Sequence, residues 1–136
     1  MRKLLVILIA SGQFLLAATL QAQTPTAPSD SVFAGVKTVL QTIARAQEIH
    51  YSNAGTYTSD ITVLRSYQAG PLYPNVKVEF VSVGKKGWAA SAMHPALSGE
   101  SCVYLIGQPE LKTESDGRFT GVSAGEARCG LASPKK

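Results

Sequence analysis

One serine of this chain lies in a pattern that some hydrolases use for covalent catalysis. Residues 121–125 read Gly-Val-Ser-Ala-Gly and fit Gly-x-Ser-x-Gly, in which a strand leads into the serine and a helix follows it. Such a hydrolase also needs a histidine later in the chain, whereas His50 and His94, the two histidines here, both precede Ser123. We therefore interpret residues 121–125 as a glycine-rich surface loop and expect neither catalytic residues nor enzymatic activity.

Histidine and acidic side chains could also ligate a metal ion. His50 lies at the expected end of a helix and His94 directly precedes a proline, so we expect packing or helix-dipole roles for both. Glu110, Glu114 and Asp116 surround a turn, where acidic side chains usually form a solvated face. We expect neither a cofactor nor a metal site, and calcium bound by these three carboxylates is the open alternative.

The two cysteines, Cys102 and Cys129, could carry redox chemistry or form a disulfide. They lie 27 positions apart, and neither belongs to a Cys-x-x-Cys motif. The N-terminal segment indicates export, and outside the cytoplasm two thiols of a small domain are usually oxidised to each other. We therefore expect a Cys102–Cys129 disulfide, which the chain-entropy relation values at about 3.5 kcal/mol for a loop of this size.

The composition indicates one small folded domain. Of the 136 residues, 45% are hydrophobic and 16% are charged, which is too apolar for a disordered chain. The net charge of +4 is not gathered into clusters of lysine and arginine, so we expect no nucleic-acid partner. The lysine pairs 85–86 and 135–136 are expected to improve solubility, with contact to an anionic polymer or membrane surface as the alternative.

The N-terminal segment has the order of a secretory signal. Residues 1–3 are a short basic start, and residues 4–20 are largely apolar. We predict a signal peptide over residues 1–22 with cleavage after Ala22. An uncleaved membrane anchor is the alternative, because residues 4–20 are about as long as the shortest membrane span. The protein is therefore expected in the periplasm or outside the cell, or anchored in the inner membrane.

A linker and a long helix are expected after this segment. Residues 23–30 contain Pro25 and Pro28 among threonine and alanine, a composition typical of an extended linker. Apolar side chains then recur at helical spacing at Val32, Val36, Val39, Leu40, Ile43 and Ala46. The pattern predicts an amphipathic helix of about 20 residues, capped by one of residues 29–31 and ended by Gly55.

A sheet is expected downstream of that helix. Alternating residues and short apolar runs predict strands over residues 76–83, 88–94, 102–106 and, as a short fourth, 118–120. The turns between neighbouring strands are short, which favours antiparallel pairing. Between helix and sheet, the spacing of Tyr57, Ile61, Leu64 and Tyr67 predicts a short second helix.

These elements indicate an α+β fold. One long N-terminal amphipathic helix is expected to pack on a sheet of three or four antiparallel strands, with one disulfide. Residues 89–92 are Ala-Ala-Ser-Ala, and such small side chains would let the helix approach the sheet closely. We expect the globular domain over residues 31–130 and a basic tail over residues 131–136.

Four tyrosines lie in or after the expected end of the long helix. They are Tyr51, Tyr57, Tyr67 and Tyr73. We expect their rings to hold the following loop onto the domain. A binding surface is the alternative, because aromatic side chains are also enriched at protein interfaces.

Several segments resemble those of type IV pilins and of type II secretion pseudopilins. Residues 43–57 resemble the helix end and following loop of these proteins, where an Ala-Gln-Glu, aromatic, Asn-x-Gly-x-Tyr pattern is common. Residues 87–97 and 101–104 look like their middle strands, and Cys129 resembles their closing disulfide partner. The likeness covers about 100 of the 136 residues, from Val32 to Gly130. It implies a pilin-like globular head and, as partners, other pilin-like subunits or an exported protein.

The N-terminal segment departs from the pattern of that family. Pilins carry a glycine cleavage site followed shortly by a glutamate, whereas the first acidic residue here is Asp30. Pro25 and Pro28 would also interrupt a continuous N-terminal helix. Two hypotheses follow. The chain is a structural or accessory subunit of a pilus or pseudopilus system, or it is a soluble exported binding module that uses a pilin-like head. A membrane contact is expected only through an uncleaved N-terminal segment.

Overall fold

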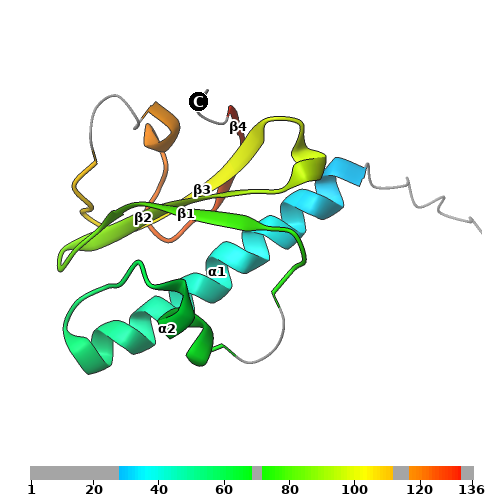
Figure 1. The fold of residues 1–136 in the computed structure, drawn as a ribbon. Helices are drawn as coiled ribbons and strands as arrows, with labels where there is room; N and C mark the ends of the chain where they lie inside the picture. The colour runs from blue at the N-terminus through cyan, green and yellow to red at the C-terminus, as the bar shows by residue number, and fades with distance from the viewer. Residues whose placement is uncertain (1–27, 69–71, 112–116, 133–136) are drawn as a thin grey trace, which may run out of the picture.

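The computed structural model describes residues 28–68, 72–111 and 117–132. They form one long helix, one short helix and a four-stranded sheet (Figure 1). The elements are α1 (Pro28–Ala54), α2 (Ile61–Ser66), β1 (Lys77–Val83), β2 (Gly87–Met93), β3 (Glu100–Gly107) and β4 (Arg128–Ala132), with 3-10 turns η1 (Pro95–Leu97) and η2 (Gly117–Phe119). The predicted signal peptide with its Ala22 site, residues 23–27 of the linker and Lys135–Lys136 lie outside the described residues.

Helix α1 is longer than the sequence pattern predicted. It has 27 residues and begins at Pro28, so the expectation that residues 28–30 are extended linker is wrong. A proline is tolerated in the first turn of a helix because the amide it lacks would have no partner there. At the other end, the backbone N–H of Gly55 bonds the carbonyl of Tyr51 at 2.8 Å, and Gly55 follows the last residue of α1 in a left-handed conformation, with φ +68°.

The short helix α2 forms where the spacing predicted it. The carboxylate of Asp60 caps its first turn by accepting from the backbone N–H groups of Thr62 at 2.8 Å and Val63 at 3.3 Å. Leu64 is fully buried and belongs to the cluster that includes the apolar residues of α1. The cap fixes where α2 starts, and Leu64 fixes which side of it faces inward.

The sheet is antiparallel throughout, with strand order β1-β2-β3-β4. The α+β class, the long helix, the antiparallel sheet and the Cys102–Cys129 disulfide are therefore confirmed. The predicted strand at residues 118–120 is wrong, because η2 ends at Phe119 and the fourth strand is β4. The side chain of Phe119 is buried against one face of the sheet, whereas β4 pairs with β3 and forms the edge of the sheet. The last strand also extends past the predicted domain end, to Ala132.

Buried side chains cover both faces of the sheet. On one face, Trp88, Ala90 and Tyr104 share a buried cluster with apolar residues of α1 such as Leu40 and Ile43. On the other face, a second cluster joins Ala89, Val103 and Leu105 to Phe119. This arrangement buries six of the seven residues of β2. Figure 1 shows α1 running along one side of the sheet and η2, in orange, on the other.

Candidate functional site

The end of α1 and the loop after it are joined by one buried amide. The Gln47 side chain has no exposed surface; its Nε2 donates to the carbonyl of Thr58 at 2.6 Å, and its Oε1 accepts from the Thr58 N–H at 3.0 Å. These two hydrogen bonds resemble the N–H···O=C pair that two neighbouring strands exchange, and they fix the loop against the helix. The signal in the sequence is a polar residue at the spacing of the buried positions Ile43 and Ala44, which the sequence prediction overlooked.

Two of the four tyrosines contact each other at this junction. The Tyr57 hydroxyl donates to Oε1 of Glu48 at 3.2 Å, and its ring centroid lies 4.6 Å from that of Tyr51. Tyr51 keeps 37% of its surface exposed. The pair therefore both holds the loop and presents one aromatic side chain to the outside.

Burial raises the pKa of two tyrosines near Glu48. Desolvation is the larger cause for Tyr57, and the charge of Glu48 raises its pKa further above 10.0. The same two causes, in the same order, raise the pKa of Tyr104, which lies in β3 on the helix-facing side. Both phenols are neutral over the physiological range, and the Tyr57 hydroxyl can therefore act as a donor to Glu48.

The other two tyrosines lie beside the histidines. The ring centroid of Tyr67 is 6.2 Å from that of His50, and that of Tyr73 is 5.7 Å from that of His94. Tyr73 also packs on α1 at Gly35, where an added Cβ would lie 2.6 Å from the ring. These contacts place the two rings as anchors of the segment after α2, in line with the expected loop-holding role.

The two histidines have different surroundings. His94 caps η1, because its Nδ1 accepts from the Ala96 N–H at 3.1 Å. Nδ1 of His50 is buried without a hydrogen-bond partner among the described residues. The described residues contain no group of three or more His, Cys, Asp or Glu side chains that could hold a metal ion, and Glu114 and Asp116 lie outside them.

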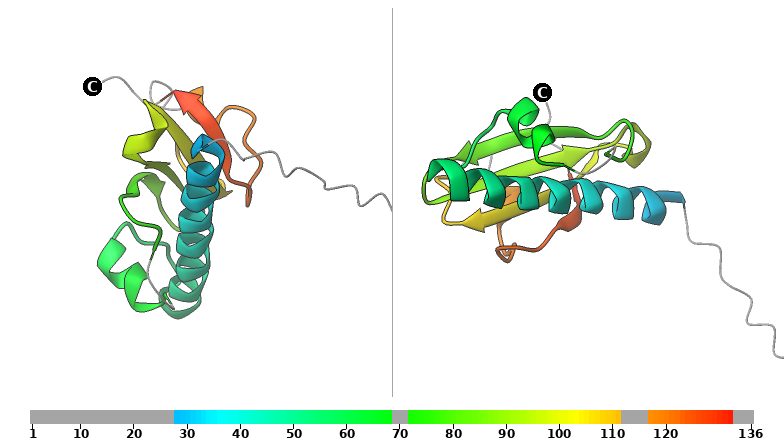
Figure 2. Two further views of the ribbon diagram at one scale, coloured as in Figure 1. Left: turned by 90° about the vertical axis from the view of Figure 1, so that its right-hand side faces the viewer. Right: turned by 90° about the horizontal axis from the view of Figure 1, so that it is seen from below.

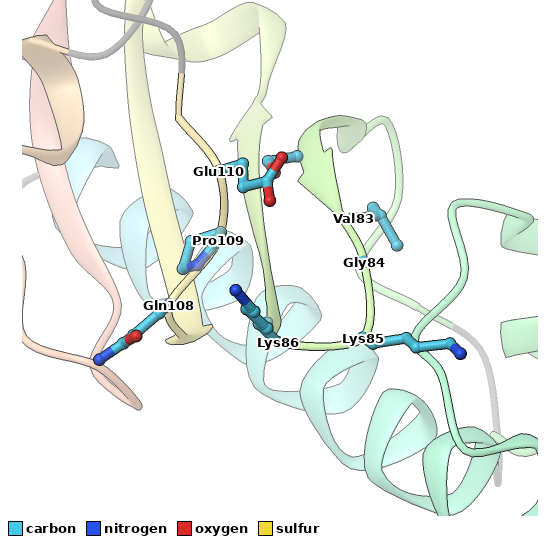
Figure 3. A pocket seen from close by; sticks show the side chains of 9 residues that line it. Val83, Gly84, Lys85, Lys86, Gln108, Pro109 and Glu110 are labelled. Atoms are coloured by element: carbon cyan, nitrogen blue, oxygen red, sulfur yellow. The ribbon is translucent and has the colours of Figure 1, made fainter.

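The lysine pair of the β1–β2 turn borders a small pocket of about 220 Å³. The turn forms one wall and residues 108–110 form the other (Figure 3). Lys85 extends away from Glu110, and both lysines are exposed. The two walls are joined at their base, where the Gln108 N–H bonds the Lys86 carbonyl at 3.0 Å. The strands are so close here that a Cβ on Gly87 would clash with the backbone carbonyl of Ile106. The glycine is required by this approach.

The Gly-x-Ser-x-Gly segment is a surface loop in the structure. It lies between η2 and β4, and Ser123 is exposed. The N–H of Gly125 bonds the carbonyl of Leu105 at 2.9 Å, which holds the loop to β3. The strand and helix that flank a nucleophilic serine in this motif are thus replaced by a 3-10 turn and a strand.

The disulfide joins the two C-terminal strands at a β-bulge. Ser101 pairs with Leu131 and Val103 with Arg128, so Cys129 and Gly130 both lie opposite Cys102. Gly130 has φ +79°, which suits the extra residue of the bulge. The bond crosslinks β4 on the side of the sheet that α1 covers, since both cysteines belong to that cluster.

Within the described ranges, no helix combines the length and the apolar character needed to cross a membrane. No protein-family model matches the chain, and no curated protein matches it.

Proposed function

We propose that this chain is an exported, non-enzymatic, pilin-like protein that serves as a structural or accessory subunit of a type IV pilus or a pseudopilus-type system. The observation that carries the proposal is the architecture. A long helix precedes four antiparallel strands that follow one another in chain order, and a disulfide crosslinks the last strand. This is the fold that the resemblance implies. A fold alone does not determine a function, so the proposal also needs support from the residues that carry the resemblance.

The residues that carry the resemblance have defined positions where α1 meets the following loop. Gly55 ends α1, Gln47 binds the backbone of Thr58, and Tyr57 contacts Tyr51. In this chain, the residues of the pattern therefore form contacts that orient the loop on the helix end, which supports a pilin-like head over a chance match of residue types.

Partners of this protein would be other pilin-like subunits or an exported protein. The first turn of α1 begins at one end of the molecule, so the chain before Pro28 joins the domain there (Figure 2, right). An N-terminal segment held in a membrane or filament would leave the sheet and the loops accessible to such partners. The membrane is contacted only through that segment.

A soluble binding module with the same head is the second candidate. Pro28 is the first residue of α1, and helices tolerate proline at a start better than in their interior. With Pro25 close before it, this start favours a break between the N-terminal apolar segment and α1. In this case cleavage after Ala22 releases the mature chain, which binds a protein or glycan outside the cytoplasm.

Cell fractionation of the native host separates the two candidates. Immunodetection in sheared-filament, membrane, periplasmic and medium fractions should place the subunit with filaments or membranes. The matched control replaces residues 1–22 with a signal peptide of known cleavage, which should move the protein into the soluble fractions. A wild-type chain found wholly in the soluble exported fractions contradicts the subunit proposal.

A further inference from the structure

The sheet has one long unpaired edge. Strand β1 pairs only with β2, so the other side of its seven residues is not paired within the described sheet. Strand β1 has a bulge between Phe80 and Ser82, and its residues 77–80 are in regular register. The opposite edge, β4, has five residues, is also bulged and is crosslinked by the disulfide. An unpaired strand edge is a template for a further strand unless it is blocked. The edge of β1 is therefore the stronger candidate for an interface (Figure 2, right).

A groove of about 510 Å³ runs beside this edge. It lies between α2 and β1, and its apolar lining comes from Ile61, Leu72, Val76, Val78 and Phe80. The side chains of Val78 and Phe80 point to the face that α1 covers, whereas Lys77 and Glu79 are exposed on the opposite face. The edge strand thus has an apolar side next to the groove and a charged side with one charge of each sign.

The order of these residues is self-complementary. If two copies of β1 pair antiparallel with Val78 opposite Val78 of the second copy, Lys77 lies opposite Glu79 on both sides of the two-fold axis. Val76 then lies opposite Phe80 on the groove side. The neighbours of Lys77 and Glu79 within the molecule are Met93 and Ser91, which carry no charge to compete for these pairs.

Other registers are disfavoured by the same charges. Moving the two-fold axis by one residue places either Lys77 opposite Lys77 or Glu79 opposite Glu79 of the second copy, and like charges directly opposite each other destabilise a strand pair. If one strand slips by a single residue against the other, Lys77 lies opposite Val78 and Glu79 opposite Val76 of the second copy, so charged side chains face apolar ones. The charges therefore disfavour the neighbouring registers and favour pairing about Val78, the register that sets Lys77 opposite Glu79.

We propose that β1 is a homodimer interface, at which a second copy of this chain adds its own β1 antiparallel about Val78. Residues 76–80 of the two copies pair and join the two sheets into one, and the apolar grooves of the two copies meet on the side of α1 and α2. The contact is isologous and closes after two copies, so it does not propagate into a fibre. It is independent of whether the chain is a pilus-type subunit or a soluble module.

Sedimentation velocity of the full-length protein over a concentration series tests this interface through charge exchange. The wild type should show a monomer–dimer equilibrium that weakens as salt is raised. Lys77→Glu and Glu79→Lys should each weaken the dimer about tenfold, because each replaces two attractive pairs by two repulsive ones. The double variant Lys77→Glu/Glu79→Lys restores both pairs and should return to near the wild-type affinity.

The matched control is Lys85→Glu, which makes the same change in net charge on the β1–β2 turn and should leave the dimer intact. Circular dichroism of each variant checks folding, and the salt dependence of the wild type tests the interface even if one variant is unstable. A protein that stays monomeric at every concentration overturns the proposal. So does a dimer that ignores the single exchanges, or a double variant no tighter than the single ones.

Discussion

The buried side chain of Gln47 determines the path of the loop that follows α1. It lies on the inward side of α1 among apolar residues and uses both ends of its amide on the backbone of Thr58. Without it, the partly buried N–H and carbonyl of Thr58 would lose these partners. The residues that follow, including Tyr57, depend on the loop path that this contact fixes.

Gln47→Ala should lower the free energy of unfolding by about 1–3 kcal/mol, because it leaves the two backbone groups of Thr58 unsatisfied. Chemical denaturation monitored by circular dichroism measures the change. Gln41→Ala, on the exposed side of the same helix, is the matched control and should change stability by less than about 0.5 kcal/mol. Equal effects of the two substitutions would show that the amide contact contributes nothing.

The raised pKa of Tyr57 predicts a loss of stability in alkali. The pKa of the folded state lies above the unfolded value of about 10, so the unfolded chain ionises first and the free energy of unfolding falls as the pH rises past 10. Tyr57→Phe should flatten this decline in thermal melts between pH 9 and about 11. Tyr73→Phe, whose ring packs beside His94 and Gly35, is the control, and an unchanged slope in Tyr57→Phe contradicts the assignment.

At the residue scale, the sequence predicted well wherever a residue type has one common role. Two cysteines in a chain expected to be exported predicted the disulfide, and the helical spacing of Val36, Leu40 and Ile43 predicted three buried positions. The role of Gln47 was missed because its partner is backbone from a loop, and a backbone group leaves no mark in the sequence.

Among the elements, β4 depends most on a covalent bond. It is short, its register shifts at Cys129 and Gly130, and it pairs only with β3. The hydroxyl of Ser101 adds one bond, to the carbonyl of Leu131 at 3.1 Å. The disulfide therefore crosslinks a short edge strand that has one neighbour in the sheet.

Replacing both cysteines, as Cys102→Ser/Cys129→Ser, should lower the free energy of unfolding by about 3.5 kcal/mol. Thermal melts with and without a reductant measure the effect, and the reductant should shift the wild type but not the double variant. A wild type that melts at the same temperature with and without reduction would argue that β4 needs no crosslink.

The small residues of β2 set the distance between sheet and helix. Ala90 is fully buried in the cluster shared with α1, and a larger side chain there would push the two layers apart. Ala90→Leu and Ala92→Leu should each cost about 1–3 kcal/mol in denaturation experiments. Ala34→Leu on the exposed side of α1 serves as the control; unchanged stability in both β2 variants would contradict close packing at this contact.

At the element scale, the alternation and short runs of apolar residues predicted β1 and β2 correctly, whereas the predicted fourth strand was at the wrong residues. Residues 118–120 look like a strand because Phe119 is apolar, yet Phe119 plugs the far face of the sheet as part of a 3-10 turn. The true β4 contains a glycine and a bulge, which weaken the alternating pattern. Strand pairing over a long loop depends on tertiary contacts that local patterns do not report.

For the whole molecule, the sheet buries apolar side chains on both of its faces, although only one long helix packs on it. Helix α1 lies on one face and the segment around Phe119 on the other, with β2 buried between them. The layer of α1 and sheet was predictable from the sequence, because both show clear periodicity. The second layer was not, because residues 108–127 have no regular pattern.

The central proposal is that the chain is a pilin-like subunit, which requires the uncleaved alternative for the N-terminal apolar segment in place of the cleavage after Ala22 that the signal pattern predicts. Intact-mass spectrometry of the protein purified from its native host tests the claim most directly. The account predicts a mature chain that retains the apolar residues before Ala22 and contains one disulfide. A mass equal to residues 23–136 less two hydrogens would contradict it and would assign the head to a released, soluble module.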